Sequence, residues 1–97
     1  MKPPPDEDEM LHEFRLRVGQ RVRMLREQKE LTQAALAGDA DVSRPAVTLL
    51  EQGLREPKIG TLIRISRALD VSVMELLIPV MRSMERMLVL VTLITVT

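Results

Sequence analysis

The chain has no cysteine, tryptophan or tyrosine, and it has a single phenylalanine among its 97 residues. The absence of cysteine excludes disulfide bonds, thiol nucleophiles and zinc sites built on thiolates. The scarcity of aromatic side chains argues against proteins that bind RNA or single strands, because those proteins stack bases on aromatic rings. Binding to double-stranded DNA needs no aromatic platform, so that class of function stays open.

Catalytic and nucleotide-binding motifs are also missing. His12 is the only histidine, so no second histidine and no cysteine can complete a metal site or a pair of nucleophile and base. Neither GxxxxGKS/T nor GxGxxG, the glycine-rich motifs that bind phosphates, occurs in the chain. We therefore expect a protein that is not an enzyme and that uses no metal and no cofactor.

Charge is segregated along the chain, although the formal total is zero. Residues 1–9, MKPPPDEDE, carry four acidic side chains against one lysine, which leaves residues 10–97 net positive. We predict a disordered acidic arm over residues 1–9, because a proline run followed by carboxylates is too polar and too stiff to join a core. The same segment lacks the apolar stretch of a signal peptide, and we expect a cytoplasmic protein without membrane association.

The apolar residues, 45% of the chain, are almost all aliphatic, as is typical of a helical core. Thr32 and Ser43 are good N-cap residues, and Ser72 and Glu75 have the spacing of a capping box. Together with apolar residues spaced three and four apart, these signals predict five helices, over residues 10–28, 33–40, 44–52, 59–69 and 73–78. The expected fold class is therefore all-α.

The second and third of these helices would form a helix-turn-helix, in which the later helix lies in the major groove of DNA. From Val18 to Leu77 the chain resembles the DNA-binding domain of the phage repressor and Cro-like family, also called the xenobiotic-response-element family. The matching segments are VGQRVRMLREQKELTQAALAGDADVSRPAVTLLEQG and EPKIGTLIRISRALDVSVMELL. The resemblance implies a five-helix repressor-like bundle over residues 10–79 and a sequence-specific transcriptional regulator that binds double-stranded DNA.

The resemblance also assigns roles to single positions. Arg26 and Glu51 match an ion pair of the family that joins the first and third helices, so Glu51 is expected to be part of the scaffold. Asp41 stands in the turn where the family usually has glycine. The residues expected to contact DNA are Gln33, Arg44, Pro45, Ala46, Thr48, Leu49, Arg55 and Lys58. Few of them can hydrogen-bond a base edge, so we expect narrow base readout and an affinity that depends largely on phosphate contacts.

Residues 80–97 extend beyond the matching domain and end in a run of leucine and β-branched residues. The spacing before about Leu88 favours a helix, and the composition after it favours a strand with two apolar faces. The segment from Met87 to Thr97 is too short for a membrane span of about 20 residues. We predict a dimerisation segment over residues 80–97 whose contact residues are Met84, Met87, Leu88, Leu90, Val91 and Ile94.

The preferred hypothesis is a homodimeric regulator that binds a palindromic operator, with one half-site for each subunit. Two alternatives stay open. One is the antitoxin of a toxin–antitoxin module, which would bind DNA and a toxin partner. The other is a protein-interaction module that has lost base recognition.

Overall fold

The computed structural model describes residues 6–96, except for the side chains of Met87, Leu88, Val91 and Val96. Its helices are α1 (Glu7–Gln28), α2 (Gln33–Ala40), α3 (Arg44–Glu51), α4 (Ile59–Ala68) and α5 (Val73–Val96). No strand occurs within residues 6–96, and the expected all-α class is confirmed.

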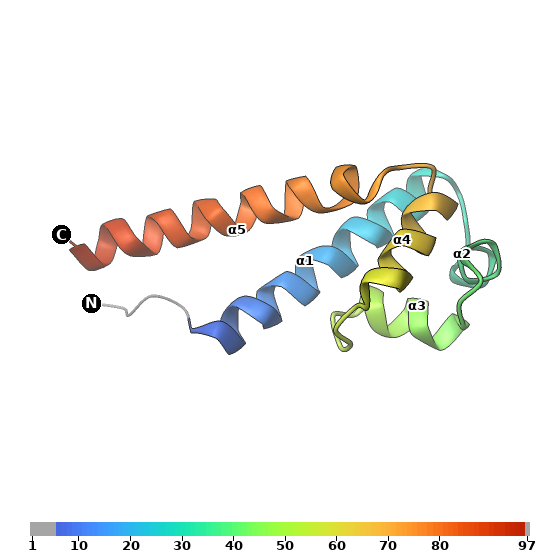
Figure 1. Ribbon diagram of the computed structural model, residues 1–97, viewed down its shortest axis with the longest axis horizontal. Coiled ribbons are helices and arrows are strands. Elements are labelled where there is room, and N and C mark those ends of the chain that lie inside the picture. The colour runs from blue at the N-terminus through green and yellow to red at the C-terminus, as the bar shows by residue number, and fades with distance from the viewer. Residues whose placement is uncertain (1–5, 97) are drawn as a thin grey trace.

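The helices α1 and α5 lie side by side and run in opposite directions, while α2, α3 and α4 gather around the C-terminal half of α1 (Figure 1). In this view α1 lies between α5 and α3, and it packs against both. The side chains that are completely buried come from all five helices or their ends: Val18, Val22, Leu36, Val47, Ile65, Leu69 and Leu76. One hydrophobic core therefore holds the helix-turn-helix against α1 and α4.

The expected caps are present. The Thr32 hydroxyl oxygen accepts a hydrogen bond from the Ala35 N–H at 3.0 Å, and Ser43 caps α3 in the same way. At the start of α5 the Ser72 N–H donates to the Glu75 carboxylate at 2.8 Å, and the Glu75 N–H donates to the Ser72 hydroxyl at 3.0 Å. These bonds satisfy backbone groups that have no partner within the helix, and they fix where the helices begin.

The first helix begins earlier than predicted, at Glu7 rather than Met10, so part of the expected disordered arm is helical. The Asp6 carboxylate accepts a hydrogen bond from the Glu9 N–H at 2.8 Å, and the first turn of α1 is entirely acidic. Carboxylates at this end of a helix are stabilised by its dipole, so the acidic run starts α1 instead of remaining unstructured. Residues 1–5 of the predicted arm lie outside the described residues.

The largest correction concerns the C-terminal segment, where α5 continues to Val96 and the predicted strand after about Leu88 does not form. Leu76 and Val80 are buried, and Met84, one helical turn further on, packs partly against the core. Packing on the core therefore holds α5 as far as Met84. The residues after it continue the same helix, because the described chain offers no strand with which they could pair. Within the described range no helix has the length and hydropathy needed to cross a membrane.

Candidate nucleic-acid interface

The turn between α2 and α3 is built on Asp41, which has the left-handed backbone angles φ 56° and ψ 46°. The following N–H, that of Val42, donates to the Ala37 carbonyl oxygen at 3.0 Å and closes α2. Aspartate tolerates left-handed backbone better than most residues, although glycine adopts it with less strain. The tight turn of a helix-turn-helix therefore forms here with aspartate at its critical position.

The expected ion pair between α1 and α3 is present and almost fully shielded from water. The Arg26 Nε and Nη2 atoms donate to the two carboxylate oxygens of Glu51 at 2.7 and 2.9 Å. The side chain of Glu51 is 3% exposed and that of Arg26 12%. The hydrogen bond to Glu51 raises the pKa of Arg26 above its ordinary value. Arg26 also donates to the Leu31 carbonyl oxygen at 2.8 Å, so one guanidinium joins α1, α3 and the segment before α2.

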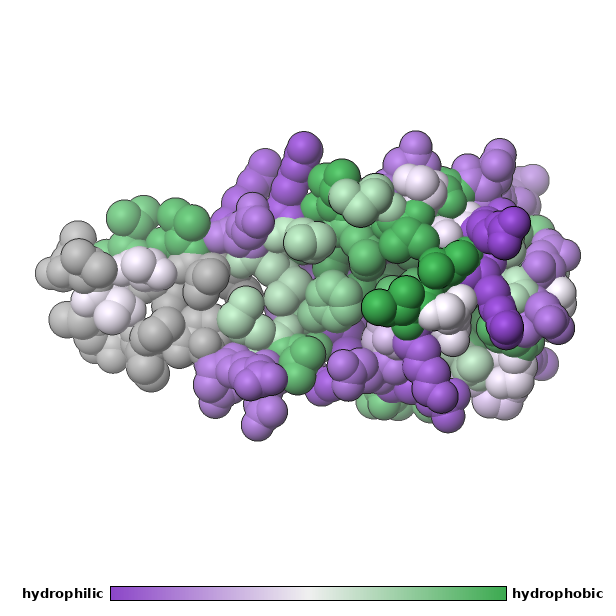
Figure 2. Space-filling model, in the orientation of Figure 1, coloured by the Kyte–Doolittle hydropathy of each residue, from purple (hydrophilic) through white to green (hydrophobic). Residues whose placement is uncertain are grey.

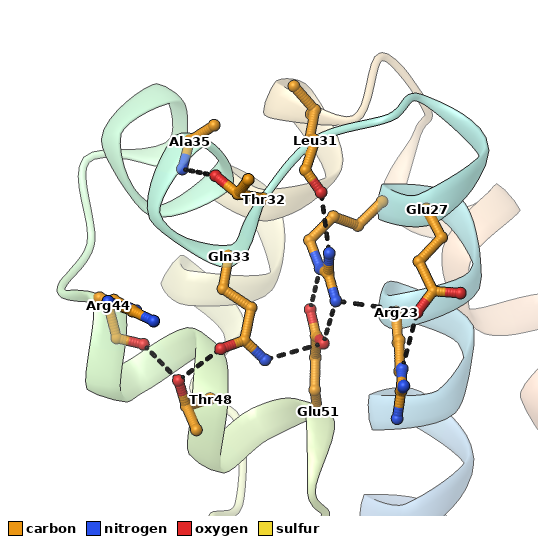
Figure 3. Close-up of polar contacts among 10 residues, drawn as sticks. Arg23, Glu27, Leu31, Thr32, Gln33, Ala35, Arg44, Thr48 and Glu51 are labelled. Atoms are coloured by element: carbon orange, nitrogen blue, oxygen red, sulfur yellow. Dashed lines mark hydrogen bonds and ion pairs between the residues drawn. The ribbon is translucent and has the colours of Figure 1, made fainter.

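A polar chain continues from this pair toward the surface (Figure 3). The Gln33 Nε2 atom donates to Glu51 at 3.2 Å, and the Gln33 Oε1 atom accepts from the Thr48 hydroxyl at 2.8 Å. The Thr48 hydroxyl also lies 3.1 Å from the carbonyl oxygen of Arg44. These bonds fix which end of the Gln33 amide faces Glu51, and they hold the first residue of α2 against α3.

The residues expected to face the major groove lie on the accessible side of α3. Arg44 and Pro45 are exposed at its first turn, and Thr48 and Leu49 are partly exposed one turn later. Val47 and Leu50 are buried on the opposite side of the helix. The helix therefore separates a core-facing side from a side that is free to meet a ligand.

Arg55 and Lys58 lie beside the same helix, although they belong to the loop between α3 and α4. Together with Ala46 and Thr61 they line a hollow of about 370 Å³ next to α3. Lys58 is the N-cap of α4, and its side chain is exposed. Two cations are thus placed at the edge of the surface that α3 presents, which suits contact with phosphates.

The sequence predicted the Arg26–Glu51 pair and Gln33 separately and missed the hydrogen bonds that connect them through Thr48. A signal was available, because positions 48 and 51 are three residues apart and therefore share one face of a helix. Arg64 was also missed: its Nη1 atom approaches the carbonyl oxygen of Asp41 at 3.5 Å and so connects α4 with the turn.

The predicted dimerisation residues fall into three groups. Met84 packs against the core of its own chain. Leu90 and Ile94 are each 60% exposed. The side chains of Met87, Leu88 and Val91 lie outside the described residues.

Comparison with known proteins finds a match to the family model HTH_3, Helix-turn-helix, over residues 22–76. The chain is 49% identical over 51 residues to YqaE of Bacillus subtilis (strain 168), an uncharacterized HTH-type transcriptional regulator. That alignment covers 53% of this chain and 44% of YqaE, so the chain spans less than half the length of this relative.

Two solved structures are similar to this fold. The restriction-modification controller protein C.AhdI from Aeromonas hydrophila is 34% identical, with a TM-score of 0.63, over 64% of this chain and 94% of its own. The clp gene regulator ClgR from Corynebacterium glutamicum is 29% identical, with a TM-score of 0.70, over 97% of this chain and 93% of its own. The likeness to ClgR therefore extends over almost the whole chain, α5 included.

Proposed function

The chain belongs to the HTH_3 helix-turn-helix family, and from this premise we propose that it regulates transcription by binding double-stranded DNA as a homodimer. In the proposed complex α3 lies in the major groove, and the N-terminus of α2 meets the phosphate backbone. Arg44 contacts a base edge, while Gln33, Arg55 and Lys58 contact phosphates.

The observation that carries this proposal is the polar chain from Arg26 through Glu51 and Gln33 to Thr48. It fixes α2 and α3 relative to each other before any ligand binds, so little order has to be gained on binding. The four N-terminal N–H groups of a helix favour an anion, and Gln33 stands at that end of α2. A phosphate is the anion that duplex DNA offers at regular spacing.

Affinity for a duplex should fall steeply as salt is added, because each neutralised phosphate contributes about −0.9 to the slope of log affinity against log salt. Lys58→Ala should weaken binding to all sequences about equally and make this slope less steep by about 1. Arg67→Ala, which removes an exposed cation at the opposite end of α4, is the matched control and should leave the slope unchanged. Affinity that does not depend on salt would rule out the proposal.

Arg44 should act differently from Lys58, because a guanidinium can donate two hydrogen bonds to one guanine edge. Arg44→Ala should cost about 1 to 3 kcal/mol on the best site and relax base preference at one position. Selection of bound duplexes from a random pool, followed by sequencing, measures that preference. An equal loss on all sequences would reassign Arg44 to a phosphate.

The same selection tests the homodimer, since a two-fold symmetric protein selects an inverted repeat with half-sites about 34 to 36 Å apart. A single unrepeated half-site would contradict the homodimer while leaving DNA binding intact. Co-purification of a small basic partner would instead favour the antitoxin reading, and no duplex binding at any salt concentration would favour an interaction module.

A further inference from the structure

The side of α5 that faces away from α1 is apolar at both ends and charged in the middle. Met74 and Ile78 are exposed in its first half, and Val89 and Leu93 in its second half. Met81 is also exposed but lies at the edge of this side, where it lines a hollow with Met10 and Phe14 of α1. Arg82 and Glu85 lie between these two groups and are exposed. In Figure 2 the charged side chains over the middle of α5 separate two hydrophobic stretches of surface.

These residues share one side of the helix. A helix turns by about 100° per residue, so positions 74, 78, 82, 85, 89 and 93 fall within one broad stripe. The opposite stripe contains Leu76, Val80 and Met84, which pack into the core. Arg82, Glu85, Arg86 and Val89 line a common hollow of about 520 Å³, which places them on one continuous surface. Glu85 stands at the edge of this surface, because it also borders a hollow with Met10 and Phe14 of α1.

The stripe is complementary to itself under two-fold symmetry. In an antiparallel pair of identical helices, a residue before the axis faces the residue equally far after the axis in the other copy. An axis between positions 83 and 84 sets Arg82 opposite Glu85 twice, once on each side. The same axis sets Ile78 opposite Val89 and Met74 opposite Leu93, which are apolar pairs. It sets Met81 opposite Arg86, whose aliphatic stem can lie along the methionine while its guanidinium stays in water.

We propose that the outer stripe of α5 is an interface with a second copy of this chain, paired antiparallel about an axis between Ser83 and Met84. This inference rests on the proposed homodimer and specifies how it forms. An axis at position 84 would place Arg82 of one copy opposite Arg86 of the other. In a parallel pair, each charged residue would lie close to the same residue of the other copy. Both alternatives juxtapose like charges and are disfavoured.

Among the residues that the structure describes, neither Arg82 nor Glu85 takes part in an ion pair. Because α1 separates α5 from α3, the pairing also leaves the proposed DNA-binding surface of each copy uncovered. The dimer can therefore be broken without altering the fold or that surface.

The test uses two charge reversals in the full chain. Arg82→Glu sets carboxylates against carboxylates in the homodimer, and Glu85→Arg sets guanidinium groups against guanidinium groups. By sedimentation velocity each variant should therefore fall from the dimer mass toward the 11.0 kDa of one chain. An equimolar mixture should dimerise again, because the carboxylate introduced at position 82 then faces the guanidinium introduced at position 85 in the other chain.

Recovery of the dimer in the mixture distinguishes a contact between chains from an effect within one chain, because mixing the two variants leaves the charges within each helix unchanged. A single variant that remains a dimer, or a folded mixture that remains monomeric, overturns the proposed register. If the parent protein is monomeric and still binds duplex DNA, this interface and the proposed homodimer are both wrong, while the proposed DNA binding stands. Salt-dependent duplex binding, measured on the same samples, tells these failures apart.

Cross-linking gives a second readout, and the chain has no cysteine of its own to interfere. The double variant carrying Ile78→Cys and Val89→Cys should form a covalent dimer on mild oxidation, because these positions face each other across the axis. Neither single variant should do so, since its cysteine lies far from its own copy. Rapid cross-linking of the Ile78→Cys variant alone would indicate parallel pairing and would overturn the proposal.

Discussion

Removal of the Glu51 carboxylate is the most informative perturbation of this fold. In Glu51→Ala the Arg26 guanidinium keeps only its hydrogen bond to Leu31 and is left in a position where its side chain is 12% exposed. Breaking a buried pair by removing one partner costs about 3 to 5 kcal/mol when the remaining charge stays desolvated. Here the exposed Glu27 carboxylate, 4.0 Å from the Arg26 Nη2 atom, still offsets part of that cost. Gln33 loses its acceptor as well, which adds about 1 kcal/mol.

Some water reaches Arg26 after the change, so we expect a total near the lower end of that range, about 3 to 4 kcal/mol. For a domain of this size each kcal/mol lowers the melting temperature by about 4 to 8 °C, so the shift should exceed about 12 °C. Urea denaturation followed by far-ultraviolet circular dichroism measures the loss directly, because all the described secondary structure is helical.

Two further variants make the reasoning refutable. Arg26→Met combined with Glu51→Leu removes both charges and should recover much of the lost stability, because no buried charge remains unpaired. Glu27→Ala breaks the exposed pair with Arg23 and the 4.0 Å contact with Arg26, and it should lower the unfolding midpoint far less than Glu51→Ala does. The reasoning is refuted if Glu51→Ala has the same unfolding midpoint as the parent, or if the double variant is as unstable as Glu51→Ala. Either result would show that burial of the ion pair contributes less to stability than proposed.

Three other outcomes are expected. Gly19→Ala should cost about 1 to 3 kcal/mol in urea denaturation, because its Cβ would overlap the Leu50 carbonyl oxygen, whereas Gly60→Ala, in open space, should not destabilise the chain. Asp41→Gly should raise the free energy of unfolding by about 0.5 to 1 kcal/mol by removing left-handed strain, and an unchanged midpoint would refute the strain. The pKa of Glu27 is lowered by the hydrogen bond from its arginine neighbour, so its contribution is present at neutral pH and lost as pH falls through that lowered pKa. The stability difference between the parent and Glu27→Gln should therefore shrink on acidification, and a difference that grew would contradict this sign.

Local signals in the sequence determined most of the helix starts. Thr32, Ser43 and Ser72 cap helices at the predicted places, because a cap depends on a side chain and the backbone within three residues of it. The Arg26–Glu51 pair was also predicted, although only through the family resemblance. Periodicity alone does not specify which two helices a pair joins.

Tertiary structure decided the rest. The last residues of α5 have strand composition, but they continue a helix that Leu76, Val80 and Met84 anchor on the core, and the described chain has no strand to pair with them. The polar chain from Glu51 to Thr48 likewise required two helices to be placed against each other, since its members come from α2 and α3. The outer stripe of α5 could be identified only when the structure showed which of its sides the core had already used.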